Sequence, residues 1–261
     1  MNAYQTADFI LVSIRTVRHG QSFKLEEVKD KAFSEFWLSY GSPGSNKDQE
    51  LAGSAALVPP LFQSAAGTVL HVGPGSGTQV SYFASNSKVD RIYGAEPAIG
   101  LHDQLAAEIR VAKLDDKYFI LPCKADTADI TKALKDRGIN LTAEGHFDSI
   151  ICVRTLCSMP DPDSVIRELY HLLKPQGQLL VLEHVKNPWQ SKEGSLVARL
   201  LQSFYMLLGW RFFVGGCCLD RDLEQSLRRV GESEGRWEEM KLESHFAWNV
   251  LPYLKGELRK R

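Results

Sequence analysis

The sequence lacks long hydrophobic runs, a signal peptide and an excess of basic residues. Its 261 residues include no stretch of about 18 consecutive apolar residues, the length that a membrane-spanning helix requires. The N-terminus has no basic region, and its apolar run at 9–14 is too short for a signal peptide. Lysine and arginine number 31 against 32 aspartates and glutamates, so the chain has no basic excess that would attract nucleic acid. These absences predict a cytoplasmic protein with no transmembrane segment and no nucleic-acid partner.

The sequence also lacks the cysteine spacings of metal-binding and thioredoxin-like proteins. No C-x-x-C pair, the spacing typical of both, occurs among its five cysteines, which are Cys123, Cys152, Cys157, Cys217 and Cys218. Free cysteines are by default small buried side chains. The pattern predicts a reducing, intracellular compartment and no metal site.

What the sequence does contain is an alternation of strand-like and helix-like segments. Strand patterns at 68–72, 91–96, 117–125, 147–154 and 177–185 alternate with helix patterns at 78–85, 100–114, 130–138 and 162–173. Asp161 and Asp163 are predicted to cap the last of these helices. Strands separated by helices predict an α/β protein with a parallel sheet and helices on both faces. Such a sheet binds its ligand outside the carboxyl ends of the strands.

Three glycines follow the first predicted strand. The stretch VLHVGPGSGTQV at 69–80 places Gly73, Gly75 and Gly77 in the pattern G-x-G-x-G, with Thr78 after them. The dinucleotide fingerprint is G-x-G-x-x-G, so a nicotinamide enzyme is the weaker match. Glycine allows both a tight turn and a close approach of a ligand to the backbone. A tight turn without any ligand remains the alternative.

Two carboxylates follow the next strands in order. Glu96 ends the second strand, where an acidic residue can accept the hydroxyls of a ribose. Asp126 comes just after the third strand, where an adenine amino group is expected. A solvated strand end explains Glu96 equally well, and each signal alone is weak, but their order along the chain favours a nucleotide-like ligand.

These segments together resemble class I S-adenosylmethionine-dependent methyltransferases (methyltransferase type 11-like). The resemblance runs from Thr68 to Leu258 through VLHVGPGSG, YGAEP, CKADTADI, LLKPQGQLLVLEH and VLPYLKGEL. It implies a Rossmann-like, seven-stranded, mostly parallel sheet with the last strand antiparallel, N-terminal helices, and a helical insertion after the fifth strand. Within the superfamily, the chain is similar to methyltransferase-like thiol S-methyltransferases and to small methyltransferases of fungal natural-product clusters.

The resemblance implies S-adenosyl-L-methionine as cofactor and S-adenosyl-L-homocysteine as product. The implied cofactor-binding residues are His71, Gly73, Gly75, Gly77, Glu96, Pro97, Asp126, Thr127, Arg154, Thr155 and Leu156. His71 stands where the family commonly has an acidic residue that holds the ammonium of the methionine moiety. If His71 faces the cofactor, binding should weaken as the pH falls through its pKa. The alternative is a buried histidine satisfied by its surroundings.

Methyl transfer from a sulfonium mainly requires that the donor carbon and the nucleophile be held in line without water. No metal is required. His184, at the end of the fifth strand, is the preferred general base because its free pKa lies near working pH, and Glu183 and Tyr205 are the other catalytic candidates. The alternative is that His184 only orders a loop. Trp37, Tyr40, Phe204 and Trp210 are the candidate substrate-binding residues.

The predicted organisation is an N-terminal helical cap at 1–60 and a cofactor-binding domain at 61–261, with a helical lid inserted at 185–218. The insertion is amphipathic, so packing in the core, a lid and weak membrane-surface association are all retained. The predicted function is methylation of a nitrogen, oxygen or sulfur atom of a small molecule in specialised biosynthesis, by a monomer or homodimer. The alternatives are a non-methylating cofactor-binding or scaffold protein and a nicotinamide-dependent reductase.

Overall fold

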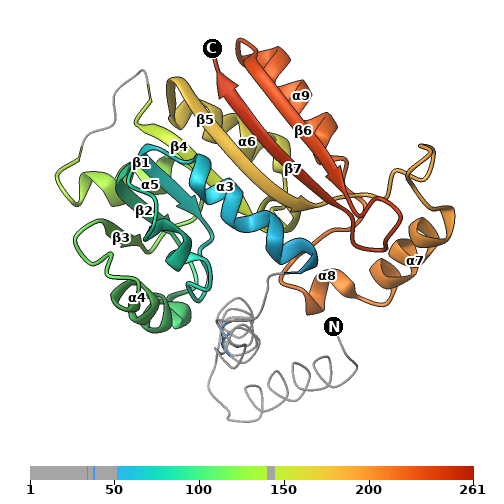
Figure 1. Ribbon diagram of the computed structural model, residues 1–261, viewed down its shortest axis with the longest axis horizontal. Helices are drawn as coiled ribbons and strands as arrows, with labels where there is room; N and C mark the ends of the chain where they lie inside the picture. The colour runs from blue at the N-terminus through green and yellow to red at the C-terminus, as the bar shows by residue number, and fades with distance from the viewer. Residues whose placement is uncertain (1–33, 35–37, 39–51, 140–144) are drawn as a thin grey trace.

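A computed structural model describes residues 34, 38, 52–139 and 145–261 of the chain. Seven strands form one sheet in the order β3-β2-β1-β4-β5-β7-β6 (Figure 1). The strands are β1 (Gly67–Val72), β2 (Val89–Ala95), β3 (Tyr118–Leu121), β4 (Phe147–Val153), β5 (Leu173–His184), β6 (Trp237–His245) and β7 (Tyr253–Lys260).

The strands from β1 to β5 pair in parallel, and β7 runs against its neighbours. β1 pairs with both β2 and β4, β2 with β3, and β4 with β5, all in parallel. β7 pairs antiparallel with β5 on one side and with β6 on the other. The predicted fold class is therefore confirmed: a Rossmann-like α/β sheet whose last strand is antiparallel.

Helices cover both faces of the sheet. Successive side chains of a strand point to opposite faces, and apolar residues occur on both, so each face needs helices to cover it. The helices and turns are η1 (Gly53–Leu57), α3 (Val58–Ser64), η2 (Val80–Phe83), η3 (Ile99–Leu101), α4 (His102–Val111), α5 (Thr127–Lys135), η4 (Leu156–Ser158), α6 (Pro162–Leu172), α7 (Leu196–Leu207), α8 (Trp210–Phe213) and α9 (Leu223–Glu234). In β1, Leu70 and Val72 pack in the core beneath α5, α6 and α9, whereas Val69 packs in the core beneath α3 and α4.

The strand order reverses between β1 and β4, which fixes where a ligand can bind. Successive strands run outward from β1 through β2 to β3, and the chain then returns to the other side of β1 as β4. In open α/β sheets the ligand binds beside such a reversal, outside the carboxyl ends of the strands. The glycine loop predicted to bind the ligand lies at this edge.

Two predicted elements differ in the structure. The helix expected at 78–85 is only the short 3-10 turn η2, because the side chain of Asn86 turns back to donate to the carbonyl oxygens of Phe62 and Ala65 at the end of α3. β6 has no counterpart among the strands located from the sequence. It is an edge strand rich in charge, and the ion pair between Glu243 and Lys255 of β7 lies on its exposed side.

The termini of the helices follow the predicted capping chemistry only in part. Asp161 caps α6 by accepting from the backbone N–H of Ser164 at 3.2 Å. Asp163 instead lies within the first turn and pairs with Arg229 of α9. The prediction that both aspartates cap this helix is therefore right for Asp161 alone.

The predicted domain boundary falls inside a helix, since α3 spans residues on both sides of position 60. Most of the predicted N-terminal cap, including Trp37 and Tyr40, lies outside the described residues. The predicted helical insertion is present as α7 and α8. Over the residues that the structure describes, no helix is both long and apolar enough to cross a membrane.

Candidate functional site

The three glycines after β1 have different physical reasons for lacking a side chain. All three have positive φ, at 63°, 60° and 88° for Gly73, Gly75 and Gly77, a conformation that favours glycine. A Cβ on Gly73 would lie 2.9 Å from Cγ2 of Thr155, and one on Gly77 would lie 3.0 Å from Leu105. A Cβ on Gly75 would meet nothing within 4 Å. The outer glycines therefore serve packing, while the backbone of Gly75 is open to a ligand.

Glu96, at the end of β2, joins this loop to the neighbouring strand. Its side chain is 4% exposed, and its two carboxylate oxygens accept from the backbone N–H groups of Gly75 and Ala98, each at 2.9 Å. A carboxylate has further lone pairs for two hydroxyl donors. Glu96 thus lies against the open glycine, and its predicted contact with a ribose stays a prediction.

An exposed apolar side chain beside Glu96 was missed by the sequence reasoning. Ile99 is 74% exposed at the start of η3, and Pro97 is also exposed. This aliphatic side chain, three residues after Glu96, offers an exposed apolar surface beside the glycine loop. The signal was present in the sequence as the apolar residue of the EPAI segment.

Asp126 and Thr127 begin α5, after β3. The carboxylate of Asp126 caps the helix by accepting from the N–H of Asp129 at 2.8 Å. The N–H of Thr127 donates to Glu168 of α6 at 2.6 Å. Both residues are partly exposed, and their predicted contact with adenine stays a prediction.

The end of β4 carries a strained arginine. Arg154 has φ of 55°, a conformation that is uncommon outside glycine and is often held at functional sites. Its guanidinium donates to the hydroxyls of Tyr253 at 3.1 Å and Ser54 at 3.2 Å. The Thr155 hydroxyl donates to the carbonyl oxygen of Val72 at 3.2 Å, which ties the ends of β4 and β1 together. Arg154 and Thr155 therefore lie at the carboxyl edge of the sheet, and their predicted contact with the cofactor stays a prediction.

Glu183 is completely buried, and its carboxylate is engaged by backbone. One oxygen accepts from the N–H groups of Thr155 and Leu156, each at 2.9 Å, and the other from Cys157 at 3.1 Å. Burial raises the pKa of this carboxyl, and the three backbone bonds oppose that rise. Glu183 therefore holds the loop after β4 in place, and its predicted catalytic role stays a prediction.

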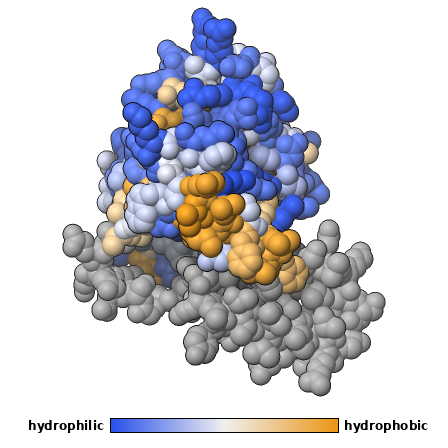
Figure 2. All heavy atoms as spheres, turned by 90° about the vertical axis from the view of Figure 1, so that its right-hand side faces the viewer, coloured by the Kyte–Doolittle hydropathy of each residue, from blue (hydrophilic) through white to orange (hydrophobic). Residues whose placement is uncertain are grey.

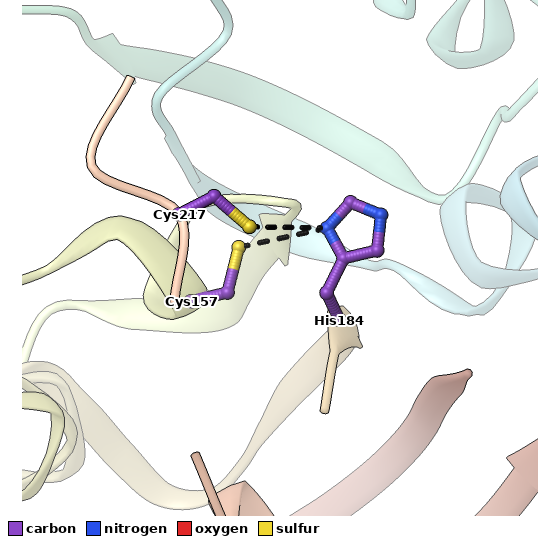
Figure 3. A group of neighbouring side chains, drawn as sticks. All are labelled: Cys157, His184 and Cys217. Carbon is purple, nitrogen blue, oxygen red and sulfur yellow. Dashed lines mark hydrogen bonds between the residues drawn. The ribbon is translucent and has the colours of Figure 1, made fainter. Parts of the chain in front are cut away.

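His184 meets two thiols at the end of β5. Its Nδ1 lies 3.6 Å from the sulfur of Cys217 and 3.8 Å from that of Cys157 (Figure 3). The hydrogen bond between the two thiols raises the pKa of Cys157, as does burial, and it lowers the pKa of Cys217 to about 5. On another side, the ring of His184 lies 4.5 Å from that of Tyr253, between centroids. The cysteines were predicted to be simply buried, and nothing in their spacing indicated that His184 joins them.

The side chain of His71 lies in the core beneath α3. Its ring is 1% exposed, packs edge-on against Phe62, and places Nδ1 2.9 Å from the hydroxyl of Tyr118. Burial lowers its pKa to about 3, against a hydrogen bond with Gln79 that raises it. The ring is therefore neutral near pH 7. Its predicted contact with the cofactor stays a prediction. With this pKa, protonation of His71 would weaken cofactor binding only near pH 3.

The predicted lid residues lie on α7 and α8. Phe204 and Tyr205 are 52% and 38% exposed, and Tyr205 stacks on Trp210. The helix is turned so that Gln202 is buried and the apolar side chains face outward. Figure 2 shows these apolar side chains gathered on one face of the molecule, formed by Leu196, Val197, Leu200, Leu201, Phe204, Leu207 and Leu208.

The N-terminal segment reaches the same edge of the sheet at a described residue. Ser34 is 5% exposed, and a Cβ added to Gly100 would lie only 2.9 Å from the Oγ of Ser34. Gly100 belongs to η3, which follows Glu96 by three residues. Part of the predicted cap therefore contacts the η3 turn beside the candidate cofactor site.

The sheet order and the glycine loop define the fold of a class I S-adenosylmethionine-dependent methyltransferase. A family model described as a methyltransferase domain matches residues 47–231, and the chain belongs to this family. The match covers more than half of the chain and includes every strand from β1 to β5. The prediction of the superfamily from sequence is confirmed.

Individual relatives agree with this assignment. The chain is 34% identical over 92 residues to human thiol S-methyltransferase TMT1B, a match that covers 35% of each chain, so only about a third of that relative is matched. Among solved structures, the [4+2]-cyclase SpnF has a TM-score of 0.57 at 16% identity, covering 89% of this chain and 96% of its own. TYW2 from M. jannaschii, in complex with AdoMet, has a TM-score of 0.50 at 13% identity, covering 82% and 79%. These two structures show the fold alone.

Proposed function

We propose that the chain transfers the methyl group of S-adenosylmethionine to the sulfur of a small-molecule thiol. The observation that carries the proposal is the open backbone of Gly75, whose N–H donates to Glu96 beside the point where the strand order of the sheet reverses. The printed names of the curated relatives favour sulfur over nitrogen or oxygen as the acceptor atom.

The donor would lie along the carboxyl edge between β1 and β4. The Gly75 backbone approaches the cofactor, Glu96 accepts its ribose hydroxyls, and Ile99 packs on its adenine. Glu183 keeps the loop after β4 in place by accepting three backbone N–H groups. The loop then presents Arg154 to the site in its strained conformation.

The acceptor would enter where β5 ends and β7 begins, at the point where the rings of His184 and Tyr253 lie against each other. Methyl transfer forms a bond between the acceptor sulfur and the methyl carbon while the sulfonium bond breaks toward the donor sulfur. A thiol attacks as its thiolate, so its proton must leave first. The site therefore has to bind a thiol in a way that favours its deprotonated form.

Calorimetric titration with S-adenosylmethionine tests the donor site. We expect micromolar binding, about −8 kcal/mol, that is lost in Gly75→Val because the new side chain occupies the open space. Gly138→Val is the matched control, since Gly138 also has positive φ (75°) with nothing within 4 Å of its Cβ position but lies outside the site. Equal loss in both variants, or binding of NADPH in place of S-adenosylmethionine, would contradict the proposal.

Turnover then separates methylation from other uses of the fold. Incubation with thiols, amines and phenols should yield S-adenosylhomocysteine and a methylated product with the thiols. Cofactor binding without turnover of any acceptor would favour the alternative of a non-methylating cofactor-binding protein.

The exposed apolar face of α7 bears on the lid and on the weak membrane-surface association predicted from sequence. Both roles fit an apolar helix face turned away from the core. Co-sedimentation with lipid vesicles separates them, because only membrane association predicts loss of vesicle binding in Leu207→Ser. Leu207 is 83% exposed, so this change should leave the fold intact.

Three finer predictions concern the cellular compartment, the biosynthetic context and the oligomeric state. The five free thiols support the predicted reducing compartment. Specialised biosynthesis and the choice between monomer and homodimer stay predictions.

A further inference from the structure

Three soft ligand atoms come together from separate parts of the chain. Cys157 lies in η4, His184 ends β5, and Cys217 follows α8 (Figure 3). Their two sulfurs and one ring nitrogen lie within 4.8 Å of one another. Both sulfurs approach the same atom, Nδ1 of His184, so the three groups converge on one point.

The spacing of these atoms fits a tetrahedral zinc ion. Zinc binds sulfur at about 2.3 Å and imidazole nitrogen at about 2.0–2.1 Å. At a tetrahedral angle, these bond lengths place a sulfur and a nitrogen about 3.6 Å apart. The observed separations from Nδ1 are 3.6 Å to Cys217 and 3.8 Å to Cys157. Both separations match those of a tetrahedral zinc site.

The surroundings also suit a metal thiolate. The Cys157 and Cys217 side chains are each 2% exposed and pack with Leu219, against Met206 and Trp210. The indole N–H of Trp210 is buried and makes no hydrogen bond within the described chain. Trp210 lies close enough to Cys217 to lower the pKa of its thiol. An apolar shell with one N–H donor beside a thiolate is typical of the outer shell of such sites.

The cluster lies beside the predicted methyl-transfer edge. Cys157 is two residues after Thr155, which is bonded to the end of β1, and its N–H is held by Glu183. His184 contacts the ring of Tyr253, whose hydroxyl is bonded to Arg154. Zinc sites with three protein ligands keep a fourth position for water or substrate.

We propose that Cys157, His184 and Cys217 bind one zinc ion, and that the fourth position of this ion takes the acceptor sulfur. The acceptor role rests on the proposed function. The thiol replaces a water on zinc and loses its proton to solvent. Its sulfur then bonds the methyl carbon as the sulfonium bond breaks, with the electron pair going to S-adenosylhomocysteine. His184 is accordingly a ligand and not the general base.

Cobalt titration of the reduced, metal-free full chain tests the ion site without donor or acceptor present. Co²⁺ substitutes for zinc and absorbs in the near ultraviolet when thiolates bind it. We expect one equivalent to bind and Zn²⁺ to displace it. Cys217→Ser and Cys157→Ser should each weaken binding more than about 100-fold, because loss of an outer-shell partner alone costs about 10–100-fold.

Cys218→Ser is the matched control, since Cys218 is adjacent and buried but bonds to the carbonyl of Gly216. It should bind cobalt as the parent does. Absence of thiolate absorption in the parent chain, or equal binding by Cys217→Ser, overturns the ion site. So does a Cys157–Cys217 disulfide that, once reduced, takes up no metal.

Methylation assays on the same samples separate this inference from the proposed function. Thiol methylation by a chain holding no metal overturns the zinc site and leaves the proposed function standing. One bound zinc with no methylation of any thiol overturns the acceptor role and the proposed function, while the ion site stands. Methylation that disappears on metal removal and returns with Zn²⁺, with S-adenosylmethionine binding unchanged, supports both.

Discussion

His71 should make the fold sensitive to acid, because its ring is buried and neutral. An unfolded chain protonates a histidine near pH 6.5, whereas burial holds the pKa of His71 at about 3 in the folded chain. Below pH 6.5 the unfolded state therefore binds a proton that the folded state does not. The stability contributed by this group is present above pH 6.5 and is lost progressively as the pH falls toward 3.

The size of the loss follows from linkage. Each pH unit in this window costs about 1.4 kcal/mol, so lowering the pH from 7 to 5 should reduce the free energy of unfolding by about 2 kcal/mol through His71 alone. His71→Gln removes the titration while retaining a side chain that can bond the hydroxyl of Tyr118.

Urea unfolding of both proteins at pH 7 and pH 5 provides the measurement. Every other titrating group is common to the two chains, so the difference in their pH dependence belongs to His71. The parent should lose about 2 kcal/mol more than the variant. An identical pH dependence in the two proteins would refute a buried neutral ring.

Three further substitutions have expected outcomes. Ile99→Ala should weaken S-adenosylmethionine binding about tenfold in calorimetry, because an apolar contact is lost. It should shift the free energy of unfolding by less than about 0.5 kcal/mol. The control Val111→Ala, at another exposed apolar residue, should leave S-adenosylmethionine binding unchanged. Glu183→Gln should lower the free energy of unfolding by about 1–3 kcal/mol in denaturant titration, because its amide N–H₂ would face backbone N–H donors; unchanged stability would contradict the geometry. Asn187→Ala should cost at least about 2 kcal/mol, since its side chain donates to two carbonyls and accepts from the N–H of Ser195, and a smaller loss would mean that water replaces these bonds.

Local patterns were sufficient for the fold. The glycine loop and the alternation of strands with helices depend on residues close in sequence, so the parallel sheet and the position of Glu96 beside the loop could be predicted. The charged edge strand β6 could not, because only Trp237, Met240 and Leu242 of its side chains pack against the core and the other six residues of the strand are polar or charged.

Side-chain direction was decided by tertiary structure. Glu183 and His184 are neighbours in a strand and therefore point to opposite faces, which buries one beneath the loop after β4 and turns the other toward the thiols. His71 follows the same rule and faces the core beneath α3. Sequence identified these residues as belonging to the carboxyl edge but could not assign their partners.

The sequence by itself determined the class of fold and the glycine loop, because each depends on short segments with a fixed local geometry. The tertiary structure alone decided that Cys157, His184 and Cys217 meet, since the three lie on segments 27 and 33 residues apart along the chain. Their proximity comes from strand order and from the way the segment after α8 folds back on η4, where the N–H of Cys218 donates to the carbonyl of Cys157. Long-range contacts of this kind depend on the packing of the whole domain, which no spacing along the sequence records.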